Sequence, residues 1–372
     1  MSRRLSWACA AIAACASAAT FAACDSGSDG GDAPSGSGGT FSKTTLNKRL
    51  AEDYRGTFKD LPSGGPKAVP DKTVAIIPLT QLSSTMSDFT REAAAAAQAI
   101  GWKSFVIDGK LTTQGFNNAI RQATSQHPDA ILLSAINCPP VQQSLLEAKK
   151  AGIKIYSVYG DDCETPVWDG SQPVDLPGAA RMRADWLASK VGPDGKVAEL
   201  YLTDDQVAVR FQKLTERALE QVCPACEVAR IEWVLSDLGE PLKGKVQTGL
   251  LRNPDAKGFV VPFDAAVTFG AGAAIQGSGL KLQIMGGECS GPNLALMRAG
   301  AQQHACTGYP FSVFGWSAID GLNRIFSGEK AVDAGLGVQL VDLEHNMPKK
   351  DEPFFGPLTD FREHYKRNWG VD

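Results

Sequence analysis

The stretch from Lys72 to Asp162 decides the fold, and it opens with the apolar run Lys72-Thr-Val-Ala-Ile-Ile-Pro-Leu79. This β-branched run between turn residues predicts a buried strand. Further strands are predicted at 104–107, 129–134 and 153–158. They alternate with helices at 113–126 and 141–151 and with a helical pattern that carries Phe89, Ala93, Ala97 and Ile100 and ends at Gly101. Three βα units with fully apolar strands predict a parallel sheet that helices cover on both faces.

Ligands of such sheets bind beyond the carboxyl ends of the strands. The loops 80–87, 137–140 and 159–169 follow three of these strands, so we expect them to line a site. Beyond a Pro/Gly-rich segment ending near Gly178, a second series of alternating elements begins. Its predicted strands are 197–202, 229–234, 258–262, 280–285, 305–309 and 336–341, and its helices are 179–191, 206–222, 242–251, 264–276, 291–298 and 313–326.

The order of several short motifs resembles the ribose-binding (sugar-binding) branch of the type 1 periplasmic solute-binding proteins. These motifs are Gly101-Trp102, Asp129-Ala-Ile131, Asn137 and Ala151-Gly-Ile153, and the resemblance covers about residues 72–345. It implies an α/β fold of two doubly wound, Rossmann-like lobes joined by a hinge of three crossings. Lobe 1 would comprise 72–165 and 310–335, and lobe 2 would comprise 166–309 and 336–346.

The N-terminus has the features of an export signal. Met1-Ser-Arg-Arg4 is basic, 5–21 is alanine-rich and apolar, and Phe21-Ala-Ala-Cys24 follows. This last motif resembles a bacterial lipobox, which implies a signal peptide over 1–23 and a lipid on Cys24; a plain signal peptide is the alternative. Residues 24–39 form a Gly/Ser-rich flexible tether, which suits a protein held at the outer face of the cell membrane.

The charge excludes one class of partner. Removal of 1–23 takes away Arg3 and Arg4 and no acidic residue, so the formal charge goes from −4 to −6. With no basic run in the chain, nucleic acid is not an expected partner.

Six cysteines remain beyond Cys24, an even number that indicates disulfides in an exported protein. They are Cys138, Cys163, Cys223, Cys226, Cys289 and Cys306. Spacing alone leaves the pairing open. Adjacent strand ends favour Cys138 with Cys163 and Cys289 with Cys306, whereas Cys223 and Cys226 would close a local loop. A redox or zinc site is the alternative for the Cys-x-x-Cys motif, but the motif closes a helix and no further zinc ligands accompany it.

Two extensions flank the lobes. In 40–71, Leu46, Leu50 and Tyr54 share a helical face, and we expect this helix to pack on lobe 1. In 347–372, Phe361, Tyr365 and Trp369 recur every four residues and predict an amphipathic helix that packs on a lobe.

The resemblance also suggests ligand-binding residues, with several departures from the family pattern. In lobe 1, Ser83, Thr85 and Met86 occupy the positions where ribose-binding relatives have an Asn and two stacking Phe residues. Asp161-Asp162 occupies the position of an Asp-Arg pair. Asn137 lies in the loop after the third strand. Trp168 either supplies a stacking face or plugs the hinge.

In lobe 2, Arg210 lies near the family's ligand-binding arginine, and Phe263-Asp264 replaces Asn-Asp. Glu288 occupies the position of a ligand-binding Asp of the family, and Tyr309 occupies the position of a Gln. These acceptors and the phenol suit a polyhydroxylated ligand, and carboxylates from both lobes also allow a cation.

No enzyme, metal or cofactor site is predicted. The four histidines are scattered, and the glycines of Phe269-Gly-Ala-Gly-Ala-Ala274 lie inside a predicted helix rather than at a strand-to-helix turn. The resemblance implies a monomeric binding protein that captures a small polar ligand, a sugar above all, between closing lobes and delivers it to an ABC importer. The alternatives are a non-sugar ligand (an amine, nucleoside or small aromatic) or a sensor subunit that presents its ligand to a receptor.

Overall fold

The computed structural model describes residues 42–160, 163 and 165–371, all within the compact unit Gly39–Asp372. The predicted signal peptide, the tether, the lipidation site Cys24, and Asp161 and Asp162 lie outside the described residues. No helix among the described residues has the length and apolar character needed to span a membrane.

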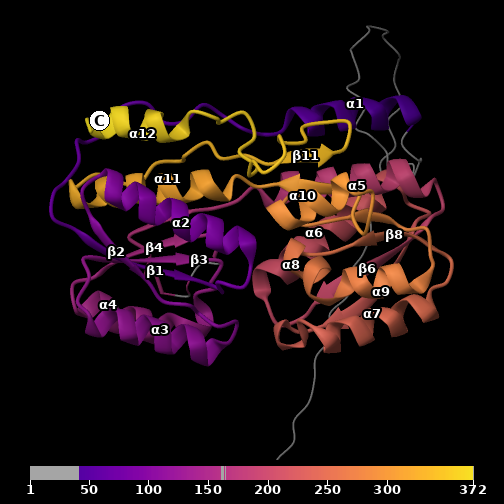
Figure 1. Cartoon of the computed structure of the whole chain (residues 1–372), viewed down its shortest axis with the longest axis horizontal. Coiled ribbons are helices and arrows are strands. Elements are labelled where there is room, and N and C mark those ends of the chain that lie inside the picture. The colour runs from indigo at the N-terminus through magenta and orange to yellow at the C-terminus, as the bar shows by residue number, and fades with distance from the viewer. Residues whose placement is uncertain (1–41, 161–162, 164, 372) are drawn as a thin grey trace, which may run out of the picture. The chain divides into compact units, whose positions relative to one another are not determined.

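Two sheets organise the chain (Figure 1). The first has the order β2-β1-β3-β4-β5, is parallel throughout, and defines lobe 1. Its strands are β1 (Thr73–Pro78), β2 (Lys103–Val106), β3 (Ala130–Ser134), β4 (Lys154–Val158) and β5 (Gly170–Gln172). Helices α2 (Ser84–Ala99) and α11 (Phe311–Phe326) cover one face, and α3 (Thr113–Ser125), η1 (Pro139–Val141) and α4 (Gln142–Lys150) cover the other. The predicted α/β architecture of lobe 1 is therefore confirmed.

The second sheet defines lobe 2 and has the order β11-β10-β9-β8-β6-β7, with only β11 antiparallel. Its strands are β6 (Lys196–Leu202), β7 (Glu227–Trp233), β8 (Ala256–Val260), β9 (Gln283–Met285), β10 (Ala305–Gly308) and β11 (Gln339–Asp342). The helical segments are α5 (Leu176–Val191), α6 (Gln206–Val222), η2 (Leu235–Asp237), α7 (Glu240–Arg252), α8 (Asp264–Ala266), η3 (Val267–Ala271), α9 (Gly272–Ser278) and α10 (Gly291–Arg298). One buried apolar cluster continues from α2 and α11 of lobe 1 to α5 and α6 of lobe 2.

The helix predicted over 264–276 is interrupted. Phe269 and Gly270 have non-helical dihedrals, and the φ of Gly270 is 141°. A Cβ at Gly270 would lie 2.7 Å from the carbonyl oxygen of Gly239, so this close approach of the backbone requires glycine. The break leaves Phe269 exposed at the edge of the interlobe cavity described below.

Three disulfides join the cysteine pairs that adjacent strand ends and the local loop favoured: Cys138–Cys163, Cys223–Cys226 and Cys289–Cys306. The third bond links the loop after β9 to β10, next to the return of the chain toward lobe 1. The Cys-x-x-Cys motif is thus a closed structural bond at the end of α6.

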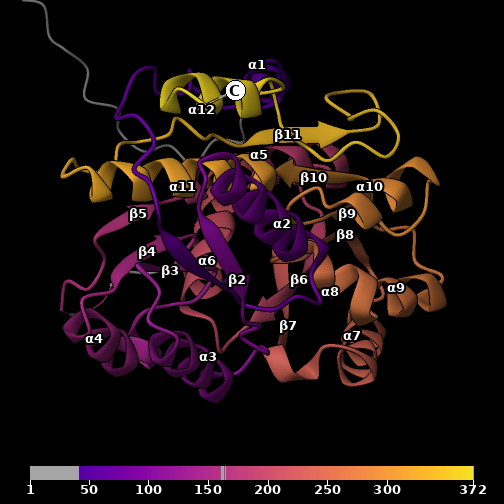
Figure 2. The same cartoon turned by 60° about the vertical axis from the view of Figure 1, so that its left-hand side comes forward.

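The helices of the two terminal extensions pack on different lobes. Helix α12 (Phe361–Trp369) lies over α11 of lobe 1 (Figures 1 and 2), where Trp369 stacks on Trp316 with ring centroids 5.7 Å apart. Helix α1 (Lys43–Arg55) contacts α5 and β11 of lobe 2, so its predicted position on lobe 1 is wrong. Two ion pairs hold α1 at α5: Arg49 binds Asp185 at 2.8 Å, and Arg181 binds the buried Asp53.

Candidate functional site

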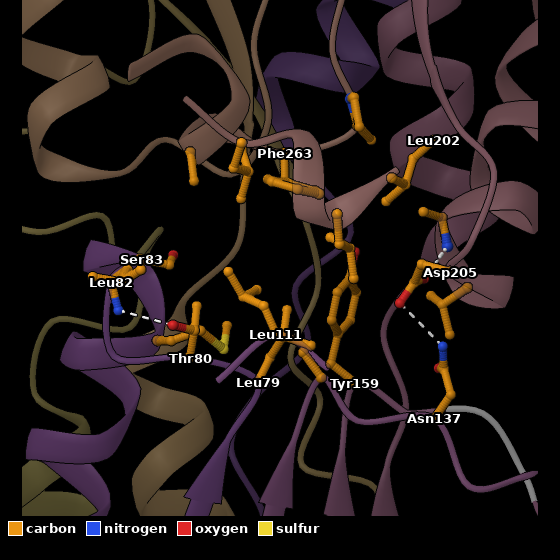
Figure 3. Close-up of a pocket in the computed structure, with 18 of the residues that line it drawn as sticks. Leu79, Thr80, Leu82, Ser83, Leu111, Asn137, Tyr159, Leu202, Asp205 and Phe263 are labelled. Atoms are coloured by element: carbon orange, nitrogen blue, oxygen red, sulfur yellow. Dashed lines mark hydrogen bonds between the residues drawn. The ribbon is translucent and has the colours of Figure 1, made fainter. Parts of the chain in front are cut away.

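A cavity of about 340 Å³ lies between the carboxyl ends of the strands of both lobes (Figure 3). Residues that follow β1, β2, β3 and β4 form its lobe 1 wall, and residues at the ends of β6, β7, β8 and β9 form its lobe 2 wall. Parallel α/β sheets bind their ligands at this edge. The position of the cavity therefore agrees with the loops that the sequence indicated.

Five of the proposed ligand-binding residues line this cavity: Ser83, Met86, Asn137, Phe263 and Glu288. The structure places Thr85, Asp264 and Tyr309 in the buried layer behind the wall. Arg210 is exposed on α6, and Trp168 packs with Val167 in the cluster under α3 and α4; neither belongs to the lining.

A hydrogen bond between described residues joins the two lobes at the cavity. The Nδ2 of Asn137, after β3, donates to Oδ2 of Asp205, after β6, over 3.1 Å. The other carboxylate oxygen of Asp205 accepts from the Ala208 amide at 2.7 Å, as an N-cap of α6. Asp205 therefore fixes the start of α6 and also bridges the lobes.

A buried cluster supports the lobe 2 wall. The Arg183 guanidinium donates to the carbonyls of Val261, Pro262 and Gly287 and to the Thr307 hydroxyl. It stacks on the Phe211 ring at 4.3 Å and is 2% exposed. Since Pro262 and Gly287 precede Phe263 and Glu288, Arg183 positions two lining residues without lining the cavity itself.

Two buried carboxyl groups link the loops after β8 and β9. Asp264 accepts from the amides of Gly287 and Ser290, each at 2.6 Å, and Glu288 accepts from the Asp264 amide at 2.8 Å. Burial, and secondarily the negative charge of Asp264, raise the pKa of Glu288 to about 8. Near neutral pH, Glu288 therefore presents a carboxylic acid to the cavity.

The pKa of Glu288 predicts a pH-dependent stability. Between about pH 4.5 and pH 8 the folded state keeps a proton that the unfolded state loses, so the free energy of unfolding falls as pH rises and levels off above about pH 8. From about pH 5 to pH 8, we expect the wild type to lose at least about 1 kcal/mol more than Glu288→Gln. Urea denaturation at both pH values measures this difference.

The amide of Glu288→Gln keeps an oxygen that can accept from Asp264, so this variant removes the titration and retains the contact. Glu232→Gln, on the exposed side of β7, is the matched control and should follow the wild type. Identical pH dependence in the wild type and Glu288→Gln would show that Glu288 is ionised in the folded protein.

The sequence did not single out four residues that build the site: Tyr159, Arg183, Asp205 and Phe211. Asp205 carried a usable signal, since an acidic residue between a predicted strand and helix is an N-cap candidate. Tyr159 lies at the start of a loop already expected to line the site, and its positive φ of 59° directs the chain at the end of β4. Arg183 and Phe211 lie in helices and carried no sequence signal for this role.

Comparison with known proteins gives one family. The model described as "Periplasmic binding protein domain" matches residues 74–330. Among curated proteins, none matches the chain in sequence.

Similar solved structures include an ABC transporter solute-binding protein from Agrobacterium vitis bound with α-D-tagatopyranose. It is 16% identical with a TM-score of 0.66, and the match covers 73% of this chain and 95% of that one. A periplasmic ribose ABC transporter from Conexibacter woesei is 18% identical, with a TM-score of 0.62 and coverage of 76% and 95%. A carbohydrate transporter solute-binding protein from Agrobacterium radiobacter, in complex with D-arabinose, is 18% identical, with a TM-score of 0.64 and coverage of 75% and 96%.

At these identities the structures support the fold, and the family match covers more than half of the sequence. This chain belongs to the periplasmic binding protein family.

Proposed function

We propose that this protein captures a small solute in the cavity between its lobes and delivers it to the membrane subunits of an ABC importer. The observation that carries this proposal is the cavity itself, which both lobes line and which Asn137 and Asp205 bridge. Lobe closure around a ligand excludes water and strengthens each polar contact. Delivery to an importer is supported by relatives described as ABC transporter proteins.

Sugars and polyols are the first ligand candidates, because similar structures hold tagatose, arabinose and allitol. A solute with a more apolar body is the second candidate, and the composition of the cavity wall favours it, as developed in the next section. In either case we expect the solute to leave unchanged, because the family consists of binding proteins. We do not expect turnover.

The lipid anchor also belongs to this proposal. Lipidation of Cys24 and the Gly/Ser-rich segment after it would hold the protein at the outer face of the cell membrane. This placement would keep the protein beside the membrane subunits of an importer. A sensor that presents its ligand to a receptor would need the same placement. Uptake of the labelled ligand by cells with and without this protein therefore distinguishes import from sensing.

A thermal-shift screen of the mature protein against sugars, polyols, amines and nucleosides tests the proposal. A ligand at about 100 times its Kd stabilises the folded state by about 2.7 kcal/mol, so one chemical class should raise the Tm clearly. Small-angle scattering should then show a smaller radius of gyration with that ligand. If no class raises the Tm, or if a strong ligand leaves the radius unchanged, capture by closing lobes is wrong.

A further inference from the structure

The walls of the cavity are mainly apolar. Leucines of lobe 1 face the ring of Phe263 and the side chain of Leu202 in lobe 2 (Figure 3). The apolar residues that meet across the space include Leu79, Met86, Leu111, Leu202, Phe211 and Phe263. Apolar surface of this extent binds ligands that bring apolar surface of their own.

Position 263 shows most clearly that this wall is more apolar than the family pattern. The resemblance places an asparagine there in sugar-binding relatives, and this chain has Phe263. Trp233 lies behind Phe263 with ring centroids 5.6 Å apart and holds its ring in place. A fixed ring at the cavity wall offers a flat contact surface and no hydrogen bond.

Most of the polar side chains of the wall already have partners within the protein. Thr80 accepts from the Leu82 amide, Ser83 pairs with Thr85, Thr112 accepts from the Gly115 amide, Asn137 donates to Asp205, and Glu288 accepts from the Asp264 amide. A polyol needs a partner for each hydroxyl that it buries, and each unpaired group is costly. The wall therefore suits a ligand with few polar groups.

The hydroxyl of Tyr159 is a polar group of the wall that a ligand can reach. Among the described residues, this hydroxyl has no hydrogen-bond partner. Edge contacts with Tyr309 and Phe311, at centroid distances of 6.0 and 6.2 Å, hold this ring in place beside the cavity. Tyr159 can therefore bind a polar group on one edge of a ligand.

The charges of the wall disfavour anions. No arginine occurs among the described lining residues, and Lys110, their single basic side chain, is exposed at the edge. Carboxylates and phosphates are usually bound through arginine or lysine in a buried position. Asp205 adds an acidic group instead.

We propose that the ligand is an uncharged molecule with a flat apolar ring body and its polar group on one edge, where Tyr159 binds it. This inference rests on the proposed function and specifies its ligand class. The cavity of about 340 Å³ has room for a bicyclic ring compound.

Three probes separate the ligand classes: 2-naphthol, which has an uncharged ring and one hydroxyl; 2-naphthoate, which has the same ring and a negative charge; and allitol, which is polar all round. Calorimetric titration of the mature protein should show 2-naphthol binding at least about tenfold more tightly than either other probe. Phe263→Asn should weaken 2-naphthol binding by about tenfold or more. Leu251→Asn, on the same lobe and 81% exposed, is the matched control and should leave binding unchanged.

Leu82→Asn provides a second test in case Phe263→Asn does not fold, because Leu82 lines the edge of the cavity and is 68% exposed. It should weaken 2-naphthol binding by about two- to fivefold. Tighter binding of allitol than of 2-naphthol would overturn this inference and leave the proposed function intact. The inference would also be wrong if neither substitution affected the binding of 2-naphthol. If none of the three probes bound saturably, this inference alone would be contradicted, because the wider screen tests the proposed function.

Discussion

Replacing Arg183 with methionine is expected to lower the free energy of unfolding by about 3 kcal/mol. The substitution keeps the aliphatic part of the side chain and removes the guanidinium. Three backbone carbonyls and the Thr307 hydroxyl then lose a donor in a site without access to water. The removed charge was itself costly to bury, which offsets part of the loss. Urea denaturation of both proteins measures the difference.

Arg217→Met is the matched control, because Arg217 lies on the exposed side of α6. This change should stay within about 0.5 kcal/mol of the wild type. Arg183→Lys should fall between the two, since an ammonium keeps the charge but cannot reproduce the planar array of donors. If Arg183→Met were as stable as Arg217→Met, Arg183 would not hold the loops after β8 and β9.

The sequence was sufficient to predict most of the fold, for physical reasons. Strands buried on both faces must be apolar runs, and the runs at 73–78 and 130–134 are strands β1 and β3. Gly101 and Gly152 end their helices with φ of 83° and 85°, a conformation that glycine adopts without strain. The Cys138–Cys163 pair was predictable because neighbouring strands in a parallel sheet end close together. In the Cys289–Cys306 pair, Cys306 lies within β10 itself, next to the end of β9.

Other elements depend on tertiary contacts that local patterns do not contain. Strand β5 is Gly-Ser-Gln, has no apolar pattern, and forms only because β4 offers it an edge. Helix α1 contacts α5, a helix more than a hundred residues away, and the Arg49–Asp185 ion pair is one of these contacts. Its apolar face alone could not indicate which lobe it covers.

The site was predicted in part. Loop positions at strand ends followed from topology, which is why Ser83, Asn137 and Glu288 lie at the cavity. The resemblance could not indicate the chemistry of the wall, since the residues that make it apolar come from many separate elements. Tyr159 and Arg183 act through their three-dimensional surroundings, and neither lies in a motif. Proposals for Asp161 and Asp162 remain predictions, because these residues lie outside the described part of the chain.

A cavity-filling substitution is expected to have the largest effect on binding. Ala208 lines the cavity from the first turn of α6, and its amide, which caps the helix through Asp205, is unaffected by a change of side chain. An indole at this position would occupy much of a space of about 340 Å³. Ala208→Trp should therefore weaken binding of any ligand held between the lobes by more than about 100-fold, or about 2.7 kcal/mol.

Leu251→Trp is the matched control, because it adds the same ring on the same lobe at a side chain that is 81% exposed. The decisive measurement is a calorimetric titration of the ligand that gives the largest thermal shift into the wild type and both variants. The two-lobe account predicts wild-type affinity for Leu251→Trp and a loss of more than about 100-fold for Ala208→Trp. Wild-type affinity in Ala208→Trp would contradict it, because the ligand would then bind outside the cavity.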